Sequence, residues 1–414
     1  MKKLSGLLCA VALLFSLAAP CFAVSVCGDA DSDGSVTPAD ARLVLRIAVG
    51  LEPAEGIAVP LDVDLDGDVT PADARLVLRR SVGLEKLFPA EMPFTPPIEG
   101  ESPDVAIDAP RALLYDATDN RLLFRKNIDE KTAPASVIKL LTALTALKYC
   151  APDDVFTVGD EIDLIGKDSS VSDLKKGWRL TLEQLLYGMM LPSGNDAAYC
   201  VAVNVARTLG DCPDPREAVA RFASLMNETA LELGMTDTCV VSPDGYDAPG
   251  QYTTARDLLT LARAALQNEL LTAVCGTFET TFTPAGEENP QTWKSTNRYL
   301  NPEDRFYDPH VFGLKGGYTE DAGCCLLSAW RVNGRDYIVL LMGLESFNAR
   351  YHLSSLLVNA VEPDEITVPP ENPPEEPSTE DPLDGEPTTE APQTEEPTTQ
   401  AAFPDDPPRD EVAG

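Results

Sequence analysis

Apolar residues recur along the chain with two different periods. Strand-like patterns occur near both ends of the region from about 104 to 361, at 112–115, 122–125, 324–331 and 336–344. Helical periodicity fills the stretch between them, including 181–190 and 216–233, and a last helix is expected over 347–361. This order predicts an α+β fold, in which one antiparallel sheet is flanked by helices and carries an inserted helical region.

The first residues carry an apolar run between charged and small residues. Met-Lys-Lys at 1–3 precedes apolar residues from 7 to 19, and a small-residue exit ends at Ala23. This pattern predicts a secretory signal peptide over 1–23 and a secreted, extracellular protein. Acylation of Cys21 is a weaker alternative because a proline precedes it. No later stretch has the apolar length of a spanning helix, so we expect no transmembrane anchor.

Two polar stretches flank the α+β region at 104–361. Residues 89–103 are Pro-rich and predict a linker. Residues 362–414 repeat Pro, Thr and Glu, which cannot bury a core, so a disordered acidic tail is expected. The net charge of −35 and the pI near 4.2 argue against nucleic-acid and anionic-membrane partners.

Cysteine and histidine positions argue against a zinc site and against a Ser-His-Asp triad. Cys9 and Cys21 lie in the signal peptide, which leaves eight of the ten cysteines, at spacings unsuited to zinc. The disulfide state stays open. His310 and His352 are the only histidines and no G-x-S-x-G sequence occurs, so a Ser-His-Asp triad has few candidates.

An internal repeat precedes the linker, within 24–88. TPADARLVLR stands at both 37–46 and 70–79, and each copy overlaps an acidic loop of twelve positions with glycine at position 6. Carboxylates at positions 1, 3, 5 and 12 and a carbonyl at position 7 are typical calcium ligands. Two acidic surface turns would not explain the paired glycines. Two structural Ca²⁺ ions are therefore predicted, at Asp29, Asp31, Asp33, Ser35 and Asp40 and at Asp62, Asp64, Asp66, Asp68 and Asp73.

The paired loops resemble a dockerin module over about 27–88. Each loop has only an exiting helix and ends in Asp, where an ordinary EF-hand has Glu. The resemblance implies a small all-α pair of loop-helix repeats, calcium-dependent folding, and docking to a cohesin domain of a scaffold or surface protein. Pro38-Ala39 and Pro71-Ala72 stand where many dockerins carry small hydroxyl residues, which leaves the cohesin type open. A calcium-stiffened spacer without a partner is the alternative.

The segment 133–139 opens an apolar helical run that continues to Leu147. Residues three apart share a helix face, so Ser136 Oγ and Lys139 Nζ can meet. A neutral amine can take the proton of a serine, and a helix N-terminus favours a developing oxyanion. The two residues are a candidate nucleophile and base, although the same spacing is common on polar helix faces.

Two further short motifs follow in the same domain. Ser193 and Asn195 share one tight loop after a predicted helix, and they offer a hydroxyl for proton relay and an amide that can hold a substrate amide. The segment 313–318 precedes a predicted strand. Its glycines allow a backbone to lie close beside a ligand, and Lys315 adds a positive charge. Each motif alone is also typical of an ordinary loop.

Ser-x-x-Lys, Ser-x-Asn and Lys-x-Gly in this order resemble the penicillin-recognising serine acyltransferases. The flanks APASVIKLLTAL, LTLEQLLYGMMLPSGNDAA and GLKGGYTEDAG are similar to the low-molecular-mass D-alanyl-D-alanine carboxypeptidases, the peptidase S11 family, over about 104–345. The resemblance implies a serine β-lactamase/D,D-peptidase-like fold. It also implies a hydrolase that removes the terminal D-alanine of peptidoglycan stem peptides through an acyl-serine, uses no cofactor for catalysis and is inhibited by β-lactams.

The resemblance also assigns roles to single residues. Ser136 would be the nucleophile, Lys139 its proton acceptor, and Ser193 the relay to the leaving D-alanine. Lys315 would meet the terminal carboxylate and help keep Lys139 neutral. The backbone N–H groups of Ser136 and Tyr318 would form the oxyanion hole. The substrate-binding positions would be Asn195, Lys315, Gly316, Gly317 and Tyr318.

Gly316 departs from the family pattern, which has Thr or Ser there to bind the substrate carboxylate. Loss of that hydroxyl weakens recognition by roughly 1 to 3 kcal/mol. D,D-endopeptidase activity and a catalytically weakened protein that binds stem peptides or penicillin therefore stay open. A β-lactamase is less favoured, because no acidic loop with the Glu-x-x-Leu-Asn pattern occurs. Family members also continue into a β-rich domain and a membrane-surface helix, which suggests that docking by the repeat module replaces that anchor here.

Overall fold

The computed structural model describes residues 26–54, 61–64, 68–84, 87–88 and 93–371. The predicted signal peptide at 1–23 and the predicted tail from residue 372 lie outside the described residues. Within the described ranges, no helix has both the length and the apolar character needed to cross a membrane.

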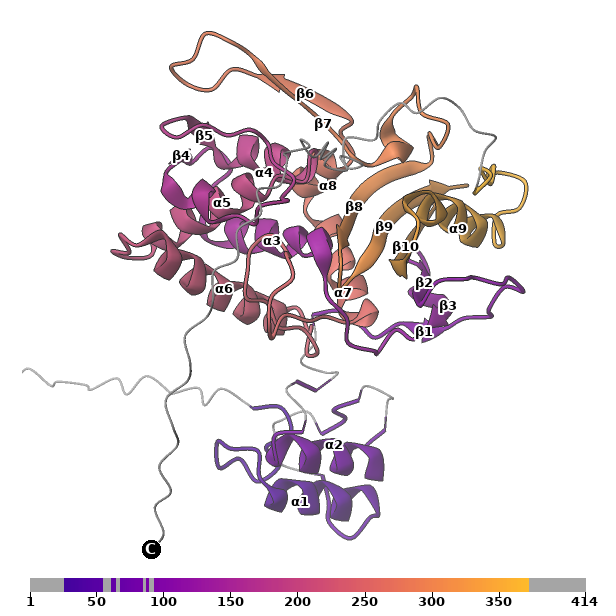
Figure 1. Ribbon diagram of the computed structural model, residues 1–414. Coiled ribbons are helices and arrows are strands. Elements are labelled where there is room, and N and C mark those ends of the chain that lie inside the picture. Colours follow the sequence, from indigo (N-terminus) through magenta and orange to yellow (C-terminus); the bar gives the residue numbers. More distant parts are fainter. Residues whose placement is uncertain (1–25, 55–60, 65–67, 85–86, 89–92, 372–414) are drawn as a thin grey trace, which may run out of the picture. The chain divides into compact units, whose positions relative to one another are not determined.

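One sheet organises the larger domain (Figure 1). Its strands are β1 (Ile98–Glu99), β2 (Arg111–Asp116), β3 (Arg121–Lys126), β8 (Val311–Thr319), β9 (Gly323–Val332) and β10 (Arg335–Leu344). In the described part of the chain they follow the order β1-β3-β2-β10-β9-β8. Only β1 pairs in parallel, with β3, and the other neighbours are antiparallel. The α+β fold with an antiparallel sheet is therefore confirmed, with β8 as one edge.

The inserted helical region lies between β3 and β8 along the chain. Its helices are α3 (Lys139–Tyr149), α4 (Leu182–Met190), α5 (Asn195–Thr208), α6 (Pro215–Glu232), α7 (Ala255–Gln267) and α8 (Glu269–Cys275), with the 3₁₀ segments η2 (Ala135–Ile138), η3 (Asp160–Leu164) and η4 (Arg298–Leu300). Two small two-stranded antiparallel sheets accompany them, β4 (Val155–Thr157) with β5 (Arg179–Thr181) and β6 (Glu279–Phe282) with β7 (Gln291–Lys294). The predicted helices at 181–190 and 216–233 correspond to α4 and α6. The last helix, α9 (Phe347–Asn359), follows β10.

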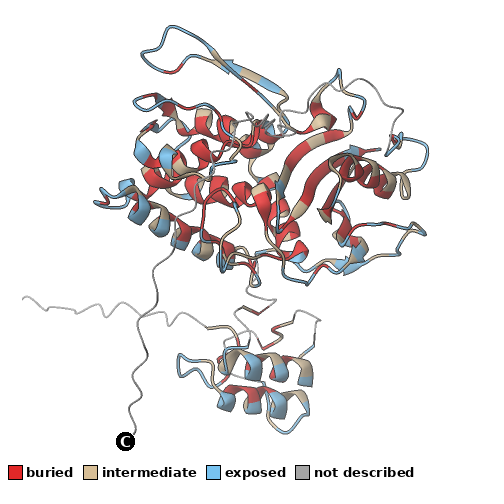
Figure 2. Ribbon diagram, in the orientation of Figure 1, coloured by how far each residue is buried: buried red, intermediate tan, exposed pale blue. Residues whose placement is uncertain are grey.

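Both faces of the sheet are buried (Figure 2). Leu113 and Tyr115 of β2 belong to the core shared with the inserted helices. Leu114 between them belongs to the opposite core, which includes Leu357 of α9. Successive strand residues point to opposite faces, so a strand covered on both sides needs apolar residues at nearly every position. This explains the continuous apolar runs in the sequence.

The turn between β9 and β10 follows directly from its sequence. Asn333 and Gly334 have φ angles of 51° and 77°. Two successive residues with positive φ are typical of the tight turns that join antiparallel strands, and asparagine and glycine tolerate this conformation best. The predicted hairpin is confirmed here.

Three sequence expectations need correction. The segment 313–318 was expected to be a loop before a strand, but it lies within strand β8, because pairing with β9 outweighs the low strand propensity of its glycines. Part of the expected linker forms β1, which pairs with β3. The expected tail begins as ordered chain: Ile366 is buried in the core beside α9, and Asn359 Nδ2 donates to its carbonyl at 2.8 Å.

The N-terminal repeats form two short helices, α1 (Pro38–Ala48) and α2 (Pro71–Ser81). Thr37 and Thr70 cap them, and the carboxylates of Asp40 and Asp73 each accept a hydrogen bond from the backbone nitrogen of the capping threonine. The small core between the helices contains Ala30, Ala41, Val44, Leu61, Val63, Ala74, Val77 and Phe88. The sequence repeat is therefore also a structural repeat.

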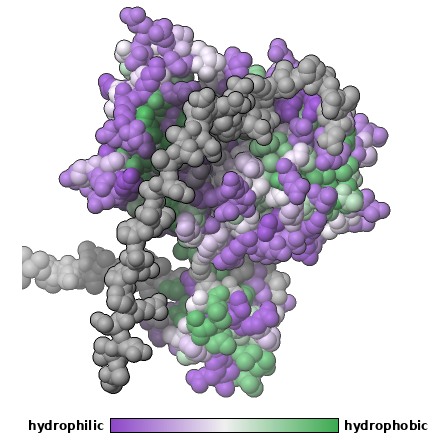
Figure 3. Space-filling view, viewed as in Figure 1, coloured by the Kyte–Doolittle hydropathy of each residue, from purple (hydrophilic) through white to green (hydrophobic). Residues whose placement is uncertain are grey.

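Apolar side chains also lie on the outer surface of this module (Figure 3). They occupy matched positions of the two copies: Leu45, Val49 and Leu51 in the first, and Leu78, Val82 and Leu84 in the second. All six side chains are exposed, so the two copies present the same apolar set to solvent from the helix and the residues just after it.

Candidate functional site

Ser136 and Lys139 meet at the start of the helical region. Lys139 Nζ lies 2.8 Å from Ser136 Oγ, within hydrogen-bond distance. Ser136 lies in η2 and Lys139 opens α3, so the two face each other across less than one turn. Burial lowers the pKa of Lys139 to about 8. A lysine with this pKa is partly neutral near physiological pH and can act as a base toward the serine.

Two further groups fix the amine of Lys139. It donates to Asn195 Oδ1 at 2.6 Å and to the carbonyl of Asp244 at 2.9 Å. Asn195 Nδ2 in turn donates to Ser169 Oγ at 2.8 Å. Asn195, the predicted amide-binding residue, is thus hydrogen-bonded through both its oxygen and its nitrogen, and it helps to orient Lys139. Neither Ser169 nor Asp244 was predicted as a site residue.

Ser193 and Lys315 form a second hydroxyl–amine contact. Lys315 Nζ donates to Ser193 Oγ at 2.8 Å and to the carbonyl of Gly316 at 2.9 Å. Ser193 has a φ of 63°, a left-handed conformation on the tight loop before α5. Lys315 is buried in β8. The structure therefore brings the three motifs together from η2, the α4–α5 loop and the sheet edge.

Burial and mutual repulsion lower the pKa of the two lysines of the site. Burial, and then repulsion from Lys139 and Arg350, lower the pKa of Lys315 well below its usual value. The pKa of Lys139 is lowered by burial itself, while the carboxylates of Asp244 and Asp196 act in the opposite direction. Burial is thus the first cause of the lowered pKa of both lysines, and the repulsion between the two amines disfavours a positive charge on either of them while the other is charged.

Strand β8 passes close to the nucleophile at Gly317. A Cβ at this position would lie 2.8 Å from the backbone nitrogen of Ser136 and 2.9 Å from Ala135 Cβ. Only glycine allows this approach, which brings the strand edge beside the N–H of Ser136. Tyr318 follows, with an exposed ring 5.3 Å from the ring of Phe347.

Arg350 of α9 lies behind Gly316. A Cβ on Gly316 would be 3.5 Å from Arg350 Nη1, and that guanidinium is buried. Its Nη1 and Nη2 contact the carbonyl of Cys325 and the hydroxyl of Tyr351, whereas Nε has no hydrogen-bond partner among the described residues. Sequence reasoning missed this residue. A charged residue among the mostly uncharged residues of the last helix was the available signal.

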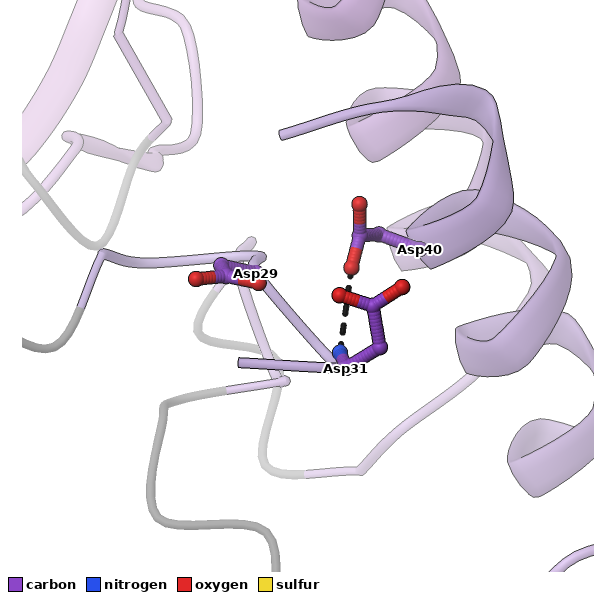
Figure 4. Close-up of side chains that lie close together, drawn as sticks. All are labelled: Asp29, Asp31 and Asp40. Carbon is purple, nitrogen blue, oxygen red and sulfur yellow. Dashed lines mark hydrogen bonds between the residues drawn. The ribbon is translucent and has the colours of Figure 1, made fainter. Parts of the chain in front are cut away.

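Each N-terminal loop brings three of its predicted carboxylate ligands close together. Carboxylate oxygens of Asp29, Asp31 and Asp40 lie within 4.8 Å of one another (Figure 4), and those of Asp62, Asp64 and Asp73 do the same. The grouping does not include Asp33, whose Oδ1 accepts from the Ser35 nitrogen at 2.9 Å. It does not include the exposed Asp68 either, and Asp66 lies outside the described residues.

These carboxylate groups fit the chemistry of a calcium ion. Asp40 is fully buried, and its two oxygens accept from the backbone nitrogens of Asp31 and Thr37. Partial desolvation and the carboxylates of Asp40 and Asp33 raise the pKa of Asp31. Three carboxylates this close repel one another, and a hard cation with oxygen ligands relieves that repulsion.

The fold and these contacts define the class of serine hydrolases in which a lysine serves as the base. A family model described as D-alanyl-D-alanine carboxypeptidase, peptidase S11, matches residues 98–346, and the chain belongs to this family. The match begins at β1, earlier than the boundary at 104 expected from the sequence.

Individual relatives agree with this assignment. The D-alanyl-D-alanine carboxypeptidase DacD of Salmonella typhimurium is 31% identical over 258 residues, which cover 59% of this chain and 60% of the relative. DacF of Bacillus subtilis is 27% identical, with 58% of each chain covered. The chain thus spans less than two thirds of the length of these relatives. The crystal structure of the Streptomyces K15 DD-transpeptidase matches with a TM-score of 0.57 and 28% identity, over 63% of this chain and 98% of that one.

Proposed function

We propose that this protein is a serine D-alanyl-D-alanine carboxypeptidase that removes the terminal D-alanine from peptidoglycan stem peptides. The observation that carries the proposal is the contact of 2.8 Å between Nζ of the buried Lys139 and Oγ of the half-buried Ser136. Lys139 takes the serine proton while Ser136 Oγ forms an ester with the penultimate D-alanine carbonyl. Ser193 relays a proton to the nitrogen of the leaving D-alanine, and water then cleaves the ester.

A free terminal carboxylate suits the cationic side of this site. Lys315 and Arg350 both lie at Gly316, and each carries a donor that can reach toward the space that a side chain there would fill. Charge-assisted bonds from a lysine and an arginine can supply part of the carboxylate binding that a hydroxyl at position 316 would add. This arrangement favours carboxypeptidase over endopeptidase activity, because an endopeptidase substrate has no carboxylate at that position.

Restoring the hydroxyl provides a direct test of this arrangement. A threonine fits at Gly316, since its Cβ would meet Arg350 Nη1 at an ordinary 3.5 Å. We expect Gly316→Thr to raise kcat/KM for a D-Ala-D-Ala peptide by about fivefold, the equivalent of one net hydrogen bond of about 1 kcal/mol. Gly316→Val is the matched control, because it adds the same volume without a hydroxyl. A fall in kcat/KM for both variants would mean that Arg350 needs the open space.

The activity itself is tested by two measurements on the mature protein. Release of D-alanine from a pentapeptide ending in D-Ala-D-Ala supports a carboxypeptidase. A benzylpenicillin adduct in intact-mass spectra without D-alanine release would favour the stem-peptide- or penicillin-binding alternative. Rapid loss of penicillin from solution would favour a β-lactamase, and absence of both adduct and turnover would contradict the acyl-serine mechanism.

We also propose that the chain is exported, and that its N-terminal module binds calcium and docks to a cohesin domain. Two clusters of three carboxylates and their position at the start of capped helices support the calcium sites. The six matched apolar side chains, which lie in the two helices and just after their C-terminal ends, support docking because exposed apolar patches mark interaction surfaces. The repetition also means that either helix offers a cohesin the same face.

Docking is tested by retention of the protein at a cohesin-bearing surface. Chelation of calcium should release the protein, and Leu45→Asp with Leu78→Asp should do the same while leaving penicillin acylation unchanged. Retention after deletion of residues 27–88 would contradict the docking proposal, and the module would then be a spacer.

A further inference from the structure

A buried carboxylate beside the base has no part in the mechanism given above. Asp244 is 1% exposed, in the loop between α6 and α7, and its backbone carbonyl accepts from Lys139 Nζ at 2.9 Å. Its Oδ1 accepts from Ser242 Oγ at 2.8 Å and from the backbone nitrogen of Tyr246 at 3.1 Å. Its Oδ2 has no hydrogen-bond partner in the described part of the chain. A buried carboxylate with one unpaired oxygen is costly unless a cation lies nearby.

Lys139 is surrounded by charges of both signs. Asp196 faces it from α5, Asp244 from the α6–α7 loop, Lys315 from β8, and Arg350 of α9 lies behind Lys315. The carboxylate of Asp196 is already satisfied, because its two oxygens accept from the backbone nitrogens of Ser172 and Leu174 at 2.8 and 3.0 Å. Asp244 therefore carries the less compensated negative charge of the two. It meets Lys139 through its carbonyl, and its carboxylate acts at longer range.

We propose that the carboxylate of Asp244 stabilises the ammonium that Lys139 becomes when it takes the proton of Ser136. This inference rests on the proposed acyl-serine mechanism and adds a positioning residue to it. In the acylation step the Ser136 O–H bond breaks, its proton joins Lys139 Nζ, and Ser136 Oγ bonds the substrate carbonyl carbon. The positive charge then appears on a desolvated amine, where a fixed carboxylate is worth more than in water.

The proposal predicts a change in the pH dependence of acylation. Acylation needs neutral Lys139, so the rate in the wild type falls as pH drops through its pKa of about 8. Asp244→Asn keeps the acceptor for Ser242 and Tyr246 but removes the charge that favours the ammonium. The pKa of Lys139 then falls, and the acid limb of the rate profile moves to lower pH by about one unit. The plateau rate at alkaline pH falls roughly tenfold, because the weaker base forms an unsupported ammonium.

The measurement is the second-order rate constant for acylation of the mature protein by benzylpenicillin across a pH series. Asp247→Asn is the matched control: it removes the same charge three residues along the same loop, from a carboxylate that accepts from the Asp321 nitrogen. We expect no displacement of the acid limb in this variant. If Asp244→Asn lowers the thermal midpoint, Asp244→Ser replaces it and should move the limb in the same direction.

The outcomes separate this inference from the proposed function. A wild type that forms no adduct at any pH overturns the acyl-serine mechanism itself. A wild type that acylates, with the same acid limb in the Asp244 variants, overturns the role of Asp244 alone. An unmoved limb with a longer-lived adduct would instead give Asp244 a direct part in deacylation. An equal displacement of the acid limb in Asp247→Asn would mean that the net charge of the loop, and not the position of Asp244, sets the pKa of Lys139, and would overturn the role of Asp244.

Discussion

Replacing Ser136 with alanine is expected to abolish covalent labelling by benzylpenicillin and to lower D-alanine release by at least about 10⁴-fold. Acylation requires a nucleophilic atom at this position, and Lys139 orients only the Oγ of Ser136 among the described hydroxyl groups. Ser193 Oγ is held by the other amine, that of Lys315, so it does not offer a substitute. Intact-mass spectrometry after incubation with penicillin measures the adduct directly.

The alanine variant should remain folded. Lys139 keeps two strong acceptors, Asn195 Oδ1 and the Asp244 carbonyl, after the hydroxyl is lost. Its thermal midpoint is therefore expected to stay close to that of the wild type. Ser224→Ala, at an exposed position of α6, is the control for loss of a serine hydroxyl and should acylate normally. An adduct that persists on Ser136→Ala would place the nucleophile elsewhere.

The order of strands and helices could be predicted because apolar periodicity and turn residues act locally. Asn333-Gly334 encodes its own hairpin, and the repeat encodes two capped helices. Strand β8 was not predicted as a strand, because its glycines have low intrinsic strand propensity. Pairing with β9 and the need for close approach to Ser136 decide its conformation, and both depend on residues distant in sequence.

Candidate site residues could be predicted only where a motif marks them. Ser136 and Lys139 are three residues apart on one helical turn, so their contact follows from local geometry. Asp244 contacts Lys139 although the two are 105 positions apart in the sequence, and Arg350 of the last helix lies beside the space that a side chain at Gly316 would fill. Ordinary residues in ordinary sequence surroundings gain these roles only from the tertiary fold. A motif position alone does not place a side chain: Asp33 stands at a predicted ligand position, but its carboxylate lies outside the cluster of Asp29, Asp31 and Asp40.

Removal of calcium is expected to unfold the N-terminal module and to leave the catalytic domain intact. Without a cation, each loop holds three carboxylates within 4.8 Å of one another, and Asp40 and Asp73 are fully buried. The opposing core is small and centres on Val44, Val77 and Phe88. Binding at a calcium concentration 100 times Kd stabilises the folded state by about 2.7 kcal/mol for each site. A core of this size does not offset the loss of two such contributions.

Amide hydrogen exchange with and without a chelator measures this effect in the full chain. Peptides from α1 and α2 should lose protection, while those from the sheet should not. All three tryptophans lie beyond residue 177, so their fluorescence reports on the catalytic domain alone and should not change. Asp40→Asn with Asp73→Asn should reproduce the chelated state in the presence of calcium, whereas Asp33→Asn should have a smaller effect because its carboxylate lies outside the cluster. Full protection of both helices in chelator would show that the carboxylates are stabilised by the capped helices themselves, and the calcium proposal would fail.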